Sequence, residues 1–177
     1  MAALFFIYVG TETSIGGWSA ERVRRLAVHG ANLATIAPMF FYAGLMAGRG
    51  LVSFVLVRFC ERQVVRAALG LATLGTVVVI AAGSQRIAVG GFVLAGLGCA
   101  SVYPIYISWF SKWYGAAARR LGGVVFSMAS LGGSAMPWLV GFTSMKAASL
   151  RTGLLVPLIG CLVMLGGLVL LRRQRLV

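Results

Sequence analysis

The sequence predicts an all-α membrane protein whose helices cross the bilayer several times. Apolar residues make up 60% of the 177 residues, and the mean hydropathy is +0.95. Soluble domains contain only about 45–50% apolar residues. One helical crossing needs about 20 residues, so the chain has room for about six or seven crossings and for almost no soluble domain.

Six long runs with few charges predict six transmembrane helices in a single domain that covers residues 1–177. The connections between these runs are short and mostly basic, and short connections make successive helices antiparallel neighbours. The predicted spans are about 2–20, 31–57, 64–83, 87–110, 121–144 and 152–171.

The net charge of +13 comes from 16 lysines and arginines, nearly all of them between the apolar runs. Basic residues in short loops are typical of a membrane surface, so we expect the lipid bilayer, and no nucleic acid, as a partner. Nine of these residues follow spans two, four and six, and six lie on the other side of the membrane. This difference favours cytoplasmic termini. We expect a multi-pass protein of the cell (inner or plasma) membrane. The nine are Arg58, Arg62, Arg66, Lys112, Arg119, Arg120, Arg172, Arg173 and Arg175, and the six are Arg22, Arg24, Arg25, Arg86, Lys146 and Arg151.

Few side chains in this sequence can carry acid–base chemistry or bind a metal. Aspartate is absent, and the acidic residues and the single histidine are Glu12, Glu21, Glu61 and His29. Paired carboxylates, catalytic triads and metal sites need more of these groups than the chain supplies. We therefore expect no enzyme activity, no catalytic residue, no metal site and no cofactor beyond a coupling ion, a proton or sodium.

Glu12 is the acidic residue that lies in the middle of an apolar run. An ionisable group at membrane depth usually marks a pathway or a site. Hydroxyls and glycines surround it between Tyr8 and Trp18, where a purely structural span would carry leucines. We expect Glu12 to meet something polar inside the bilayer.

Polar and aromatic side chains recur at helical spacing in spans two and five and also gather in span four. Spans three and six are poor in such groups and are predicted to face lipid. Helix packing alone can explain serine and threonine in membrane helices, but four polar spans, counting the one with Glu12, favour a shared aqueous cavity. The predicted cavity residues besides Glu12 are Asn32, Thr35, Tyr103, Tyr106, Ser127, Ser130 and Trp138.

Arg49 follows the segment Gly44 to Gly48 within the long second span. Two interpretations stay open. The arginine can extend its charge to the cytoplasmic headgroups near a helix end. Alternatively, it clamps a helix end or a loop in one conformational state, which would make it a gating residue.

Several segments together resemble the second half of major facilitator superfamily transporters, in the fucose and glucose permease branch. The run Tyr8 to Trp18 is similar to their seventh helix, and Gly44 to Arg49 to the end of the eighth. Gly96 to Gly98 followed by Tyr103-Pro104 resembles the tenth helix, and Ser130 to Gly141 the eleventh. The resemblance implies a twelve-helix transporter built from two six-helix halves, of which this chain matches the second. It also implies that the first, second, fourth and fifth helices of the half line the cavity.

The resemblance and the polar stripes lead to one expected function. The chain would be the C-terminal half of a secondary active transporter that takes up a sugar or a similar small polar solute, coupled to protons or sodium. Its expected partner is the missing N-terminal six-helix half, or else a second copy of the chain, because the two halves of such transporters are parallel repeats. A non-transporting membrane scaffold, or a truncated fragment without independent activity, is the alternative.

Overall fold

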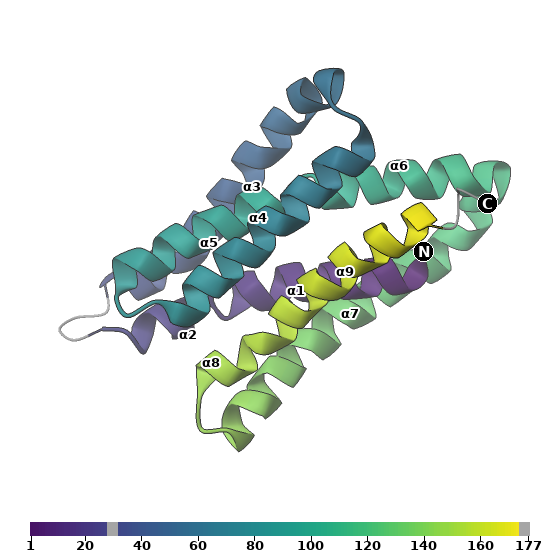
Figure 1. The fold of residues 1–177 in the computed structure, drawn as a ribbon. Helices are drawn as coiled ribbons and strands as arrows, with labels where there is room; N and C mark the ends of the chain where they lie inside the picture. Colours follow the sequence, from purple (N-terminus) through teal and green to yellow (C-terminus); the bar gives the residue numbers. More distant parts are fainter. Residues whose placement is uncertain (28–31, 174–177) are drawn as a thin grey trace.

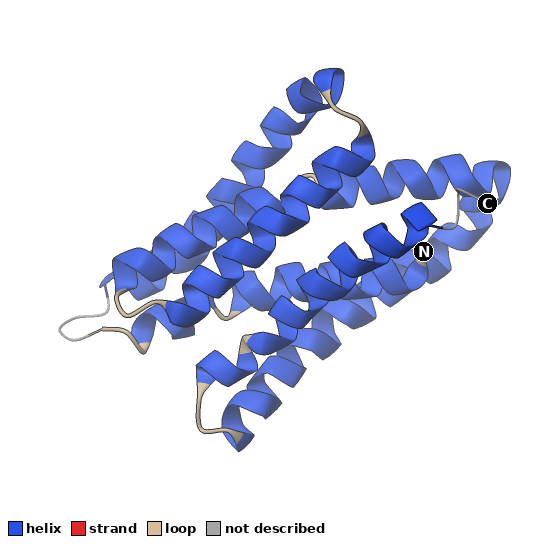
Figure 2. Ribbon diagram, in the orientation of Figure 1, coloured by secondary structure: helices blue, strands red, loops and turns tan. Residues whose placement is uncertain are grey.

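The computed structural model describes residues 1–27 and 32–173, and only the backbone of Asn32 and of residues 169–173. These residues are helical almost throughout, and neither described range contains a strand (Figure 2). The helices, shown in Figure 1, are α1 (Ala2–Gly17), α2 (Ser19–Arg24), α3 (Asn32–Arg58), α4 (Glu61–Ala81), α5 (Gln85–Cys99), α6 (Val102–Tyr114), the short 3-10 helix η1 (Gly115–Ala117), α7 (Ala118–Lys146), α8 (Leu150–Gly153) and α9 (Leu155–Arg173).

Among the described residues, four helical stretches are long and apolar enough to cross a membrane: Leu33–Arg58, Glu61–Ala81, Gln85–Lys146 and Leu150–Leu168. The third covers 62 residues, which is about 93 Å of helix and three times the thickness of a bilayer core. It runs through α5, α6, η1 and α7, and the chain reverses direction between α6 and α7 (Figure 1). The all-α architecture is confirmed, whereas the count of six crossings stays a prediction.

The segment predicted as one span over 87–110 is divided into α5 and α6. Residues Ala100 and Ser101 form a turn between the two helices. Pro104 lies in the first turn of α6 and has no N–H, so it cannot bond to the carbonyl of Ala100. The proline therefore favours an interruption of the helix at this point.

Glycines bring pairs of these helices into backbone contact. In lipid a helix satisfies every backbone N–H and C=O internally, and helices then associate most closely where side chains are small. A Cβ added at Gly96 of α5 would overlap the carbonyl oxygen of Phe41 of α3, and one at Gly132 of α7 would overlap that of Phe6 of α1. Gly75 makes a similar approach between α4 and α5.

These contacts arrange the helices in two groups. One consists of α1 and α7, and in the other α5 packs against both α3 and α4 (Figure 1). α9 joins the groups because it packs against both α1 and α4. The largest fully buried side chains include Tyr8, Tyr106, Phe5, Phe41 and Phe92, which fill the space between the helices.

Arg22 of α2 caps the end of α4. Although it carries a charge, the residue is only 4% exposed. Its Nε donates to the carbonyl of Val79 at 3.0 Å, and its Nη2 donates to those of Ile80 at 3.0 Å and Ala82 at 2.9 Å. The last carbonyls of a helix lack partners inside it, and the helix dipole favours a cation there. Burial lowers the pKa of the Arg22 guanidinium, which nevertheless stays charged.

The close approach at Gly96 generates a first prediction. In Gly96→Ala the new methyl group meets the backbone of Phe41, so α3 and α5 must separate. We expect the free energy of unfolding, measured in mixed detergent, to fall by about 2 kcal/mol. Gly90→Ala is the matched control, because a Cβ at Gly90 meets nothing within 4 Å. An equal loss of stability in both variants would contradict the role of the glycine contact.

Candidate functional site

The polar stripes predicted for spans two and five lie on exposed surface. On α3, Thr35 and Tyr42 are exposed, and on α7 the same holds for Ser127, Ser130 and Trp138. Trp138 has 66% of its surface exposed, and Tyr42 has 44%. The two stripes therefore belong to helix faces that the other described residues leave uncovered.

α1 lies between these two faces, and two adjacent residues connect it to both neighbours. Glu12 reaches Arg49 of α3, and Thr13 reaches Gly133 of α7. Gly17, one turn further on, has nothing within 4 Å of a Cβ position. We call the surface formed by these sides of α1, α3 and α7 the open face.

Glu12 and Arg49 form an ion pair on the open face. Arg49 Nη2 lies 3.7 Å from Glu12 Oε1, and the side chains are 47% and 17% exposed, respectively. The carboxylate is thus mostly enclosed by α1 and its neighbours, and the arginine approaches it from the more open side. Arg49 thereby connects α3 to α1 through the one acidic residue of the apolar N-terminal helix.

Thr13 of α1 and Trp18, which follows α1, contact α7 near Pro137. Pro137 lies inside α7 and has no N–H, so the carbonyl of Gly133, four residues earlier, loses its helical donor. The Thr13 hydroxyl donates to the carbonyl of Val9 in its own helix at 2.7 Å and lies 3.3 Å from the Gly133 oxygen. Trp18 Nε1 donates to the carbonyl of Pro137 at 3.0 Å. These contacts hold the part of α7 that carries Trp138 against α1.

Trp138, Phe142 and Lys146 follow one another along the same side of α7. Its ring stacks with that of Phe142, one helical turn further on, with centroids 5.3 Å apart and an angle of 15° between the planes. The Nζ atom of Lys146 lies 4.7 Å from the centroid of the Phe142 ring. A cation over an aromatic face is attracted by the ring quadrupole. The open face therefore carries a flat aromatic surface beside hydroxyl groups.

The two tyrosines of the predicted site lie elsewhere. Tyr106 is 0% exposed and Tyr103 is half-buried. Both rings pack edge-on against Phe5, with centroids 6.1 Å and 5.8 Å from it, and Tyr8 completes the cluster. The Tyr106 hydroxyl has no hydrogen-bond partner among the described residues. In this structure Tyr106 is part of the core and presents no surface to a solute.

The remaining candidates spread along the open face. Thr35 and Arg49 are 14 positions apart on α3, or about 21 Å at 1.5 Å per residue. Thr35 lines a hollow of about 470 Å³ together with Gly17, Trp18 and their neighbours at the end of α1. A small solute cannot touch both ends at once. The predicted role of the Asn32 side chain falls outside the described residues.

The other two carboxylates serve local contacts. Glu21 bonds to the arginines that follow it in the chain, both at 2.7 Å. Glu61 accepts hydrogen bonds from Trp109 Nε1 and Lys112 Nζ, each at 2.6 Å. No group of three or more histidine, cysteine or acidic side chains that could hold a metal lies within the described ranges. Glu12 is therefore the acidic residue of the open face.

Thr13 and Trp18 are not among the residues that the sequence predicts for the site. One signal for them is present, since Pro137 inside an apolar run predicts that a carbonyl four residues earlier needs another donor. The identity of that donor depends on which helix lies beside α7. Neither spacing nor composition contains that information.

No family model matches this sequence, and no curated protein matches it. Two solved structures have a similar fold. The first, a variant of the fucose:proton symporter FucP from E. coli, superposes with a TM-score of 0.82 at 19% identity and covers 93% of this chain. The second, FucP described as a major facilitator superfamily transporter in the outward conformation, gives 0.78 at 21% identity over 93% of this chain.

The chain spans only 40% and 39% of those two symporter chains. The chain therefore has the fold of one part of a major facilitator superfamily transporter, and that part is less than half of the transporter's length. The resemblance indicated by the sequence is confirmed at the level of the fold.

The burial of two tyrosines provides a second prediction. Tyr8 donates to the carbonyl of Cys99 at 2.9 Å, whereas the Tyr106 hydroxyl has no partner among the described residues. We expect Tyr8→Phe to lower the free energy of unfolding by about 1 kcal/mol, and Tyr106→Phe to leave it unchanged or raise it slightly. Chemical unfolding in detergent compares the two variants. A loss in Tyr106→Phe as large as that in Tyr8→Phe would mean that the Tyr106 hydroxyl is bonded in the membrane.

Proposed function

We propose that this chain is one half of a secondary active transporter for a sugar or a similar small polar solute. The open face would be one wall of the transport pathway, in a cell membrane with both termini in the cytoplasm. The Glu12–Arg49 ion pair carries the proposal. Charged groups among apolar membrane helices are costly and occur mainly where a protein handles ions or polar solutes. The fold shared with a fucose:proton symporter supports the transporter class.

The ion pair suggests how solute or ion binding is linked to helix movement. When Glu12 is ionised, its oxygens attract Arg49. A proton on Glu12, or sugar hydroxyls bonded to it, would compete with Arg49 for the same oxygens. Release of Arg49 would weaken the connection between α1 and α3. A ligand that binds two arrangements of these helices differently shifts the equilibrium between them, as alternating access requires.

Other groups on the open face suit a sugar. Ser127 and Ser130 of α7 expose hydroxyls that can exchange hydrogen bonds with sugar hydroxyls. Trp138 exposes an aromatic surface that can pack against the C–H side of a pyranose ring. Binding sites for small molecules commonly combine apolar surface with a few polar groups that fix orientation. Thr35, at the distant hollow, would line the path toward this site.

The open face also carries large apolar side chains beside its charged and hydroxyl groups. Met39 and Met46 on α3, and Leu131 and Met145 on α7, are all more than half exposed. Lipid can cover such apolar side chains, but charged groups that face lipid are costly, so the face with Glu12 and Arg49 requires water or a protein neighbour. We propose a complementary six-helix half as the partner, because the symporter chains of similar fold are about two and a half times as long as the matched part. A second copy of this chain is the alternative.

Sugar uptake tests the role of Glu12. Cells that carry the native locus are compared with cells carrying Glu12→Gln, using labelled fucose and a panel of other monosaccharides. We expect uptake to fall about tenfold or more, as for the loss of a charge-assisted hydrogen bond, at equal amounts of protein in the membrane. If only gradient-driven uptake is lost while exchange of solute persists, Glu12 acts in ion coupling. If both are lost, it binds the solute.

Glu61→Gln is the matched control for this experiment. Glu61 begins α4 and accepts hydrogen bonds from Trp109 and Lys112 of α6 rather than from a residue of the open face. We expect uptake to be unchanged in this variant. Unchanged uptake in Glu12→Gln as well would remove the proposed site and favour a membrane scaffold without transport activity.

Photo-crosslinking tests the partner. A photoreactive amino acid replaces Met46, which is 73% exposed on the open face, or Val163, which is 51% exposed on α9. We expect position 46 to crosslink a second polypeptide in native membranes, and position 163 to react only with lipid. Mass spectrometry of the product then distinguishes a different membrane protein from a second copy. Products with lipid alone at both positions would contradict a covered open face.

A further inference from the structure

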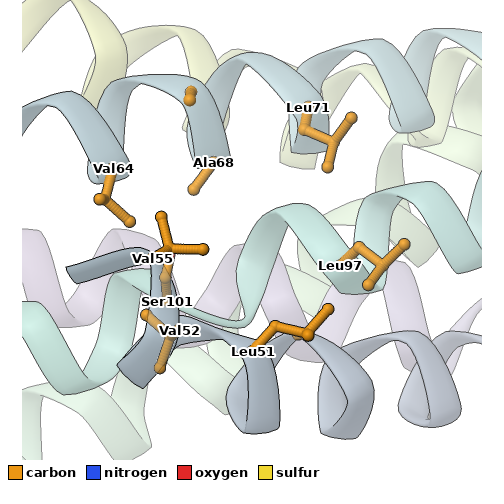
Figure 3. A pocket seen from close by; sticks show the side chains of 10 residues that line it. Leu51, Val52, Val55, Val64, Ala68, Leu71, Leu97 and Ser101 are labelled. Atoms are coloured by element: carbon orange, nitrogen blue, oxygen red, sulfur yellow. The ribbon is translucent and has the colours of Figure 1, made fainter. Parts of the chain in front are cut away.

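A hollow of about 470 Å³ lies at one end of the open face, between the end of α1, the short helix α2 and the start of α3. We call it the Trp18 hollow, and its lining residues are Gly17, Trp18, Ala20, Glu21, Arg24, Ala34 and Thr35. Sites for small molecules typically enclose about 300–1,000 Å³ and combine apolar surface with a few polar groups. The hollow between α3 and α4 in Figure 3 differs, because Val52, Val55, Val64 and further apolar side chains dominate its lining.

The Trp18 ring forms a fixed wall of this hollow. Its Nε1 donates to the carbonyl of Pro137 at 3.0 Å. The ring also packs over Gly141 of α7, where an added Cβ would lie 3.1 Å from it. Beside the ring, a Cβ at Gly17 would meet nothing within 4 Å, so the space next to it is open. An aromatic ring that is already held in place loses little freedom when a ligand packs against it.

Polar side chains from two helices line the same hollow. Glu21 and Arg24 of α2 pair with each other at 2.7 Å, and Thr35 of α3 is exposed. Arg25, outside the lining, bonds to the other carboxylate oxygen of Glu21 at 2.7 Å. Each of these oxygens can still accept a further hydrogen bond. Because the two charged residues of the lining are paired with each other, the hollow suits a neutral solute that carries hydroxyl groups.

We propose that the Trp18 hollow is a second binding site for the transported solute and holds a neutral monosaccharide. The C–H side of the sugar ring packs on Trp18. Its hydroxyls donate to Glu21, accept from Arg24 and exchange hydrogen bonds with Thr35. The choice of a sugar rests on the proposed function. The hollow itself adds the groups that recognise the sugar at a point away from Glu12.

The second site lies apart from Glu12 and Arg49 on the same face. Thr35 and Arg49 are about 21 Å apart along α3, so one monosaccharide cannot touch both. Tyr42 lies midway between them and is 44% exposed, and its hydroxyl lies 3.0 Å from the Cβ position of Gly16. The lysine and arginine count places the hollow on the side of the membrane opposite the cytoplasm. A solute taken up from outside therefore reaches Trp18 before it reaches Glu12.

Photoaffinity labelling of the full chain in native membranes tests this site. The probes are diazirine derivatives of fucose, galactose and glucose, and mass spectrometry locates the labelled peptides. With at least one probe, we expect label in the peptides that carry Trp18 and Thr35, and an excess of the unmodified sugar should prevent it. Label near Trp138 reports the proposed site beside Glu12 in the same sample.

Gly17→Leu fills the Trp18 hollow, and Gly90→Leu is its matched control. Both glycines are exposed and helical, and a Cβ meets nothing within 4 Å at either. We expect Gly17→Leu to lower the affinity of the hollow about tenfold or more, because the leucine occupies the space of the sugar. Label near Trp138 should stay unchanged in both variants, and Gly90→Leu should leave the hollow unchanged too.

Thr35→Val tests the hydrogen bonds without filling the hollow. We expect the affinity for the sugar, measured by competition against the probe, to fall about fivefold, as for the loss of one hydrogen bond. Thr152→Val is the matched control, because Thr152 is an exposed threonine of α8 outside the hollow. Its affinity should equal that of the wild type.

Label near Trp138 alone would overturn the second site. So would label in the hollow that excess sugar does not prevent or that Gly17→Leu leaves unchanged. Sugar uptake that depends on Glu12, with no label in the hollow, would remove this site and keep the proposed function. Competed label in the hollow of a chain that takes up no sugar would keep the sugar site and remove the proposed transport.

Discussion

The close approach of helix backbones at glycines is the constraint on which the rest of this structure depends. Helices in a bilayer gain little by hiding apolar surface from one another, because lipid is equally apolar. Their association rests on packing, which is strongest where a missing side chain lets two backbones touch. Gly132 brings α7 onto α1, and Gly96 brings α5 onto α3. The first contact brings Pro137 of α7 within hydrogen-bond distance of Trp18, and the second helps to hold the helix that carries Arg49.

Several polar side chains packed among the helices donate hydrogen bonds to carbonyl groups of other helices. Arg22 donates to the last carbonyls of α4, and Trp18 donates to the carbonyl of Pro137 in α7. These contacts are local and stabilising, because an unpaired polar group in a bilayer costs several kcal/mol. The pair of Glu12 and Arg49 differs, since it joins full charges on a partly exposed surface.

α3 contributes to two different surfaces of the chain. On the open face it carries Met46 and Arg49, beside hydroxyls and aromatic rings. On another side, Val52 and Val55 line an apolar hollow between α3 and α4. A shift of this helix would alter both surfaces together.

The sequence by itself determined the all-α class, the positions of most helices and the exposed stripes of α3 and α7, because these follow from hydrophobicity and helical period. Only the tertiary structure decided that Glu12 meets Arg49, that Thr13 meets Gly133, and that Tyr106 is buried while Trp138 is exposed. Tyr106 and Trp138 are both large aromatic residues on polar helices, so composition cannot separate them. Which side of a helix is covered depends on its neighbours, and those neighbours are chosen by backbone contacts between residues that are distant in the sequence.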